Sequence, residues 1–268
     1  MKFYISVDWE GISGVVSWEI QDDIKSPSYL ETRRRMTKEV NSAVEGLYDG
    51  GATYVLVNDS HGNMTNLLID DLDPRAELIM GSPKPFSMVE GLTSDFNGAL
   101  LLGYHASAGT YRGIMDHTYS GSSIYEIRVN GEPYSEGDLN GSFAGSLGVP
   151  VVLVSGDKSA VDSLMLRFMG ALGVVTKIAL GRTTARLYHP TKIYEELRNK
   201  AKEAAKNSTV LKPFCPDTPI IIEIDFTTTQ KADMASILPE AERIGPRTVK
   251  IVSPNMQTAF RRLLVLIR

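Results

Sequence analysis

The chain has 268 residues, of which 43% are hydrophobic, and a formal net charge of −4. This length allows one large domain or two modest ones, with enough apolar residues for a buried core. No basic stripe interleaved with aromatic residues is present, which argues against nucleic acid as the main partner, and no apolar run is long enough to span a membrane.

The first half of the chain alternates apolar runs with one long amphipathic segment. Apolar residues recur at helical spacing between residues 29 and 48, and Gly50 and Gly51 follow, so a helix is predicted there. Continuous apolar runs are typical of strands that are covered on both faces. Such strands are predicted at residues 3–7, 54–57 and 99–104, and a weaker strand at 76–80.

The second half begins with a predicted hairpin. Residues 125–129 alternate between apolar and polar side chains, and Asn130-Gly131, a strong two-residue turn signal, follows them. Further strands are predicted at residues 149–154, 218–224 and 249–252, and helices at 157–172, at 190–205 and from residue 255.

A proline-rich stretch at residues 207–219 is the best candidate for a linker. We therefore predict an α/β fold whose catalytic core, residues 1–206, has a mostly parallel central sheet with flanking helices. Residues 207–268 would form a smaller C-terminal α+β unit, although a single compact domain also fits the pattern.

We expect a cytoplasmic protein. The single cysteine, Cys215, cannot form an internal disulfide, which fits a reducing compartment. Residues 1–7 run into a strand and lack the charged segment and apolar core of a secretory signal.

Polar residues of the metal-ligand type follow three of the predicted strands. Asp8 and Glu10 follow the first strand, and side chains two apart in an extended backbone point the same way. His61 follows the second strand, and His105 comes directly after the strand at 99–104. Ligands of open α/β sheets bind beyond the carboxyl ends of the strands, so these four side chains are expected at one rim.

Crowded carboxylates repel one another unless a cation lies between them. Glu136, after the hairpin, can add a third carboxylate, and two imidazoles with three carboxylates suit zinc, manganese or cobalt better than calcium or magnesium. Each residue alone also has a structural explanation, such as a cap, a polar turn or a hydrogen-bonded histidine. The metal hypothesis rests on the joint pattern.

His117 lies twelve residues after His105, in a segment whose glycines, Gly109 and Gly113, are typical of a loop. It could be a further ligand, a proton-transfer group beside the metal, or a loop histidine with satisfied hydrogen bonds.

Four ordered segments resemble the DppA-type D-aminopeptidases, peptidase family M55. They are SVDWEGISG at residues 6–14, VNDSH at 57–61, KPFSMVEG at 84–91 and LGYHA at 102–106. The similarity runs from residue 1 to about residue 160 and continues more loosely to the end of the chain. Trp9 departs from the methionine of the family pattern, and residues 119–121 also diverge, so the substrate pocket could be reshaped.

The resemblance implies an aminopeptidase with two Zn²⁺ ions per chain that assembles into a ring-shaped, self-compartmentalising homodecamer. Asp8 would bridge both ions. Glu10 and His105 would complete one site, and His61 and Glu136 the other. His117 matches the catalytic histidine of the family, which would act as nucleophile or as general acid and base.

The leading functional hypothesis is a dinuclear zinc aminopeptidase that removes the N-terminal residue, a D-amino acid such as D-alanine, from short peptides by metal-activated hydrolysis. One alternative is a dinuclear metal phosphoesterase, although Arg112 is the one close candidate for a phosphate clamp. The other alternative is a non-catalytic peptide-binding protein.

Overall fold

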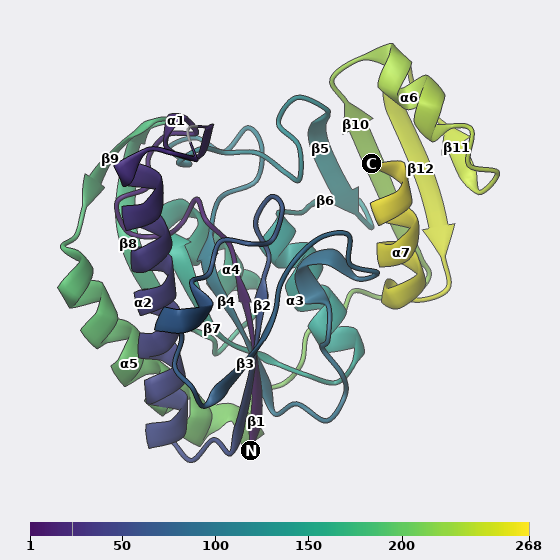
Figure 1. Ribbon diagram of the computed structural model, residues 1–268. Coiled ribbons are helices and arrows are strands. Elements are labelled where there is room, and N and C mark those ends of the chain that lie inside the picture. The colour runs from purple at the N-terminus through teal and green to yellow at the C-terminus, as the bar shows by residue number, and fades with distance from the viewer. Residues whose placement is uncertain (23, 268) are drawn as a thin grey trace.

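The computed structural model describes residues 1–22 and 24–267 and contains two sheets (Figure 1). Within the described residues the larger sheet has seven strands in the order β3-β2-β1-β4-β7-β8-β9, and its pairings are parallel except that of β9 with β8. The strands are β1 (Lys2–Val7), β2 (Tyr54–Asp59), β3 (Ala76–Ile79), β4 (Gly98–Tyr104), β7 (Val151–Asp157), β8 (Leu172–Gly181) and β9 (Thr184–Leu187). The predicted α/β class with a mostly parallel central sheet is confirmed.

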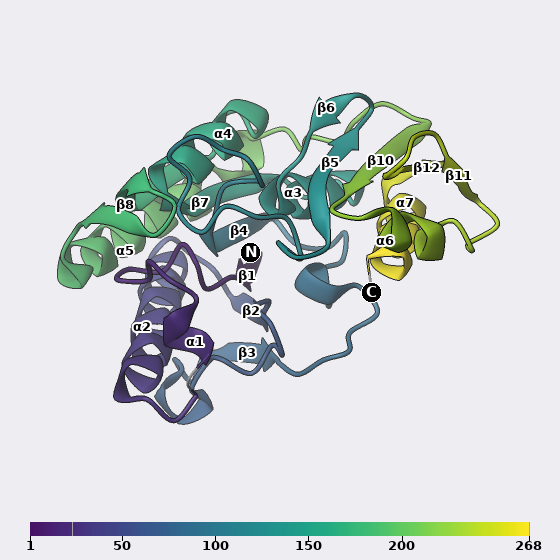
Figure 2. The same ribbon diagram turned by 90° about the horizontal axis from the view of Figure 1, so that it is seen from above.

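Helices cover both faces of this sheet (Figure 2). α2 (Pro27–Asp49) and α5 (Pro190–Asn207) pack together on one face, while α3 (Glu136–Ser146) and α4 (Lys158–Arg167) lie on the other. A short helix, α1 (Glu19–Asp22), precedes α2. The helices predicted at residues 29–48 and 190–205 are confirmed.

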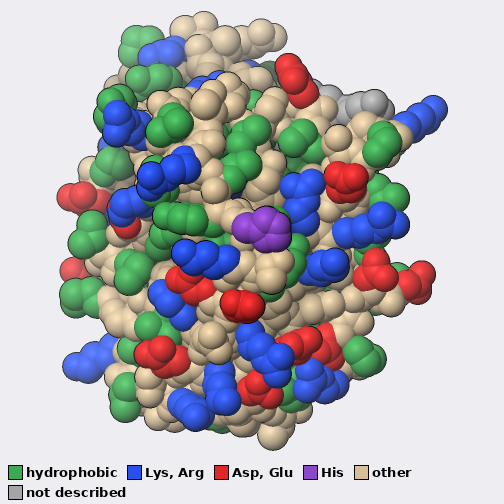
Figure 3. Space-filling view, turned by 90° about the vertical axis from the view of Figure 1, so that its left-hand side faces the viewer, with side chains coloured by type: hydrophobic (Ala, Val, Ile, Leu, Met, Phe, Trp, Pro, Cys, Tyr) green, Lys and Arg blue, Asp and Glu red, His purple; other side chains and the backbone are tan. Residues whose placement is uncertain are grey.

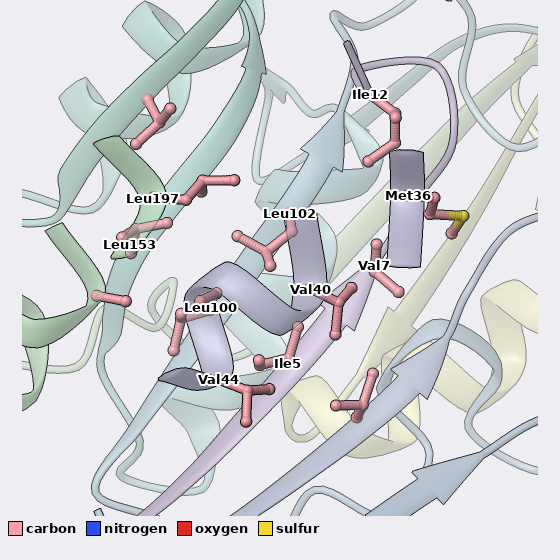
Figure 4. Close-up of a cluster of buried hydrophobic side chains, with 14 of the residues drawn as sticks. Ile5, Val7, Ile12, Met36, Val40, Val44, Leu100, Leu102, Leu153 and Leu197 are labelled. Atoms are coloured by element: carbon pink, nitrogen blue, oxygen red, sulfur yellow. The ribbon is translucent and has the colours of Figure 1, made fainter. Parts of the chain in front are cut away.

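The sequence around α2 specifies both its start and its buried face. Ser26 caps the first turn by accepting a hydrogen bond from the Tyr29 amide, and Pro27 occupies the first helical position. The apolar stripe of α2 packs onto β1 and β4 (Figure 4). Each fully buried apolar side chain there contributes roughly 1.5–3 kcal/mol to the free energy of folding. The core side chains in this layer include Ile5, Val7, Met36, Val40, Val44, Leu100 and Leu102.

Two strands at one side of the larger sheet were not predicted. The helix predicted at residues 157–172 ends at Arg167, and the chain then enters β8 and the edge strand β9. The run at residues 172–181 is apolar apart from residues such as Thr176 and Lys177. A short run of this kind cannot be assigned to helix or strand from its spacing alone.

The smaller sheet is antiparallel, with the order β11-β12-β10-β5-β6 (Figure 1). Its elements and the accompanying helices are β5 (Ile124–Val129), β6 (Glu132–Pro133), β10 (Ile220–Phe226), α6 (Thr229–Ala235), β11 (Ala241–Arg243), β12 (Thr248–Ser253) and α7 (Met256–Leu266). The hairpin predicted at Asn130-Gly131 is confirmed by the pairing of Val129 with Glu132. Phe260 of α7 packs on Phe143 of α3, with ring centroids 5.1 Å apart, which joins this unit to the larger sheet's helices.

The stretch predicted as a linker packs on the core. Phe214 meets Phe168 edge to face, with centroids 5.9 Å apart, and a Cβ atom at Gly145 would lie 1.7 Å from the Phe214 carbonyl oxygen. Strands β5 and β6 precede residue 206, so a boundary there would cut through the smaller sheet. A division into residues 1–206 and 207–268 stays a prediction.

The face over α2 and α5 carries charged side chains of both signs (Figure 3). Arg198 of α5 forms ion pairs with Glu45 and Asp49 of α2 at 3.0 Å, although exposed pairs of this kind contribute little stability. In the part of the chain that the structure describes, no helix is long and apolar enough to cross a membrane.

Candidate metal centre

The carboxyl ends of β1 and β4 approach each other closely because glycine occupies the contact. The Asp8 amide donates to the Leu102 carbonyl at 2.8 Å, and the Gly11 amide donates to the Gly103 carbonyl at 2.7 Å. Gly103 has a φ of +69°, and a Cβ atom there would lie 2.3 Å from the Asp8 carbonyl oxygen. Only glycine fits both the backbone conformation and the space, so this turn brings Asp8 beside His105.

The five predicted ligands converge on one buried cluster. His61 Nδ1 lies 3.1 Å from Asp8 Oδ1 and 3.1 Å from Glu10 Oε2. His105 Nε2 lies 3.5 Å from Asp8 Oδ2 and 3.3 Å from Glu136 Oε1. The residues come from three strand ends and from the first turn of α3, so residues more than 120 positions apart in sequence meet in one cluster.

Two groups of potential ligands share Asp8. One group is Asp8, Glu10 and His61, and the other is Asp8, His105 and Glu136, with the ligand atoms of each group within 4.8 Å of one another. This differs from the partition that the family resemblance implies, in which His105 accompanies Glu10. A third group consists of Glu10, His105 and His117, so Glu10 and His105 also lie close enough to share an ion.

The donor set fits divalent transition-metal ions. Two ligand atoms bonded to one tetrahedral zinc at about 2.0–2.1 Å lie about 3.3 Å apart, and the four separations above are 3.1–3.5 Å. In addition, Asp8 Oδ2, Glu10 Oε2 and His105 Nε2 are buried, and their contacts within the cluster lack hydrogen-bond geometry. Buried polar atoms rarely lack a partner, so these three are suited to bind a cation.

The electrostatics of the cluster also favour a cation. Burial, followed by the charge of Glu10, raises the pKa of Asp8 to about 7. Burial opposes a charge on His105, but the nearby carboxylates, with Glu136 first, raise the pKa of this imidazole to about 10. The carboxylates therefore attract positive charge strongly, and divalent ions would satisfy this attraction and displace the protons.

Several hydrogen bonds fix the ligands in place. Glu136 begins α3 directly after the cap residue Ser135, and its Oε1 accepts a hydrogen bond from the Tyr119 amide at 2.6 Å. The Asp59 carboxylate accepts from the amides of Asn66 and Leu67, which shapes the loop after His61. Glu136 thus has the first-turn position that a helix dipole favours and also lies at the cluster.

His117 lies against the cluster. Its ring stacks on that of His105, with centroids 4.0 Å apart, and its Nε2 lies 3.7 Å from Glu10 Oε1 and 3.8 Å from Glu136 Oε1. Its Nδ1 lies 2.8 Å from the Met115 carbonyl oxygen. Because a carbonyl oxygen can only accept, Nδ1 carries the proton in the neutral ring and Nε2 is left as a base.

A cavity of about 460 Å³ opens beside these residues. Asp8, Glu10, His61, His117 and Glu136 all line it. The apolar part of the cavity wall includes Trp18, Met88, Leu264 and Ile267. The last two belong to the C-terminal α7 region.

Trp9 and Arg112 lie outside this lining. Trp9 is fully buried and stacks on His61, with ring centroids 5.7 Å apart, so it acts on the orientation of this imidazole. Arg112 is exposed and lies over the Tyr111 ring, 5.3 Å from its centroid. It does not line the cavity as a phosphate clamp would.

Sequence reasoning missed two buried lysines beside the site. Lys177 of β8 donates to the carbonyl oxygens of Ile12 at 2.8 Å and Val15 at 2.6 Å, and it also bonds the Glu10 carbonyl. Lys84 lines the cavity. The interruption of an apolar run by Lys177 was a usable signal, whereas Lys84 was visible only as part of a family segment.

The D-aminopeptidase family, Peptidase M55, matches residues 1–265. The chain belongs to this family. It is 37% identical over 270 residues to a D-aminopeptidase of Bacillus subtilis (strain 168), with 99% of this chain and 96% of that protein covered.

A solved structure agrees with this assignment. The Zn-dependent D-aminopeptidase DppA from Bacillus subtilis, described as a self-compartmentalizing protease, superposes with a TM-score of 0.94 at 36% identity. The match covers 99% of this chain and 96% of that chain. Membership of a peptidase family confirms that the chain is an enzyme of the hydrolase class, as the sequence resemblance indicated.

Proposed function

We propose that this enzyme is a dinuclear zinc aminopeptidase that hydrolyses the N-terminal residue, a D-residue such as D-alanine, from short peptides. The observation that carries the proposal is the pair of ligand groups that share Asp8. The Zn-dependence of the structural relative supports zinc as the ion.

Asp8, Glu10 and His61 would hold one ion, and Asp8, His105 and Glu136 the other. When bound, the ions would polarise the scissile carbonyl and lower the pKa of a bound water from about 16 toward 7. The chain itself supplies the rigid strand-end framework, the proton-transfer group and the shape of the cavity.

His117 is proposed as the general acid and base. Nδ1 is oriented by the Met115 carbonyl, so Nε2 can take a proton from the attacking water and return it to the leaving amine. Its Nε2 lies within 3.8 Å of both Glu10 and Glu136, which places the base at the ligand cluster. This role uses the tautomer that the contact between Nδ1 and the Met115 carbonyl favours.

The cavity suits a short peptide with a free amino terminus. Asp8, Glu10 and Glu136 line it, and the ions that they would hold could bind the lone pair of a free α-amine. A volume of about 460 Å³ accommodates a few residues at most, which agrees with short substrates.

Metal content tests the dinuclear proposal. The zinc-reconstituted enzyme should hold about two ions per chain, and Asp8→Ala should lose more than any other single ligand change because Asp8 serves both groups. Elemental analysis measures this, with His189→Ala as control, since His189 is exposed at the start of α5. A wild-type content of about one or less would contradict the proposal.

The role of His117 is tested by His117→Ala. This variant should keep its zinc and lose about 10²-fold or more in kcat, because proton transfer is lost while the ligands remain. Steady-state kinetics and elemental analysis are measured on the same preparation. Loss of zinc in proportion to activity would identify His117 as a ligand instead.

Paired peptides test the aminopeptidase reaction. D-alanyl and L-alanyl dipeptides, each with a free and an acetylated amine, are assayed with the zinc-loaded enzyme. The free D-alanyl peptide should turn over, whereas acetylation removes the amine lone pair that the ions would bind and should abolish turnover. Equal rates on free and acetylated peptides would rule out an aminopeptidase, and a preference for the L-peptide would overturn only the stereochemistry.

We also propose a homo-oligomer, in the form of a decamer. The relative is described as self-compartmentalizing, and large apolar side chains are exposed here, including Leu166 at 81%, Met169 at 82% and Ile237 at 70%. Exposed apolar patches often mark protein contacts. Size exclusion coupled to light scattering should give a mass of about ten chains, and a monomer would contradict the assembly while leaving the site unaffected.

A further inference from the structure

Lys84 is a buried cation at the edge of the metal centre. The residue lines the cavity and is only 6% exposed. Among the described residues that line this cavity, Lys84 is the one Lys or Arg side chain. Lysine is rarely buried to this extent unless its charge is paired.

No carboxylate of the described residues forms an ion pair with Lys84. Its Nζ donates to two neutral acceptors, Asn58 Oδ1 and the Asp59 carbonyl oxygen, each at 2.6 Å. An ammonium group has three donors, so one remains for a ligand. These two hydrogen bonds also hold the ammonium in a fixed position at the end of β2.

The nearby carboxylates are bound elsewhere. Asp59 accepts from the Asn66 amide at 2.5 Å and from the Leu67 amide at 2.8 Å, and Glu90 accepts from the Phe86 amide at 2.7 Å. Burial is the main influence on Lys84 and lowers its pKa to about 8 despite these two charges. The site thus has a positive group that the protein does not neutralise locally.

Lys84 and the ligand cluster line the same cavity. The Asp59 carbonyl that anchors the ammonium belongs to the end of β2, two residues before His61, so the Cα atoms of Asp59 and His61 are at most about 7 Å apart. A terminal carboxylate one or two residues beyond the scissile bond of a peptide lies roughly 3.5–7 Å from that bond. A cation anchored beside the ligand cluster on one cavity suits the carboxylate end of a small substrate.

We infer that Lys84 binds the C-terminal carboxylate of the substrate, and thereby selects di- and tripeptides with a free C-terminus. The inference rests on the proposed aminopeptidase function and assigns the group that recognises the end of the peptide opposite the free amine. Lys84 is a specificity residue, and it acts through charge and not on the scissile bond.

The test compares D-alanylglycine with D-alanylglycinamide, which differ only in the charge of the C-terminus. The wild-type kcat/KM should favour the acid by about 10-fold or more, because a charge-assisted hydrogen bond in a buried site discriminates by at least that factor. In Lys84→Met the ratio should fall to about 1, and Lys84→Arg should restore part of it.

Lys158→Met is the matched control. Lys158 is exposed on α4 and pairs with Asp162 at 2.6 Å, so its loss should leave the acid-to-amide ratio unchanged. Zinc content and melting temperature are measured for every variant. A wild-type ratio near 1, or equal losses on acid and amide in Lys84→Met with the ratio preserved, would overturn the inference.

A binding measurement separates this inference from the proposed function. His117→Ala enzyme loaded with zinc is titrated with both peptides by calorimetry, in the presence and absence of the Lys84→Met change. Tighter binding of the acid that depends on Lys84 supports the inference, whether or not the wild type hydrolyses the peptides. If the wild type hydrolyses neither peptide, that result refutes the proposed function alone. Equal affinities for acid and amide would overturn the inference.

Discussion

Repulsion among three buried carboxylates is the constraint on which this site depends. Asp8 lies within 3.5 Å of both His61 and His105, whereas Glu10 lies 3.1 Å from His61 and Glu136 lies 3.3 Å from His105. All three carboxylates are buried, which weakens the screening of their charges by water. Such an arrangement is stable only with cations between the carboxylates, or with protons in their place. The close approach of β1 and β4 at Gly103 brings Asp8 beside His105, and bound cations would offset the repulsion of the carboxylates.

The surrounding fold holds these charges in place through backbone contacts more than through charged partners. Lys177 binds carbonyl oxygens of the loop after Asp8, and Asp59 binds amides of the loop after His61. Neither residue neutralises a ligand directly. Within the described residues, no lysine or arginine forms an ion pair with Asp8, Glu10 or Glu136, so these carboxylates stay available for a metal ion while hydrogen bonds order the loops that carry the candidate ligands.

Much of the fold and of the candidate site could be predicted because the informative features are local. Apolar runs that end in Asp8, His61 and His105 revealed both the parallel strands and the rim at which they meet. Strand β8 was missed because its apolar run has no decisive period, and the joining of β5 to β10 depends on residues almost a hundred positions apart. Lys84 was not singled out from the sequence, because its burial and its neutral hydrogen-bond partners depend on the three-dimensional structure.

The wall of the cavity has a separate origin from its chemistry. Leu264 and Ile267 border the cavity from the C-terminal α7 region, more than 120 residues after Glu136, the last of the proposed ligands. α7 packs against the antiparallel sheet and α3 and contributes no ligand. Substitutions in this helix can therefore alter which side chains fit while the hydrolytic centre stays intact. The candidate ligands and the apolar wall formed by α7 thus belong to separate elements, so the wall can change in sequence without a change in the ligands.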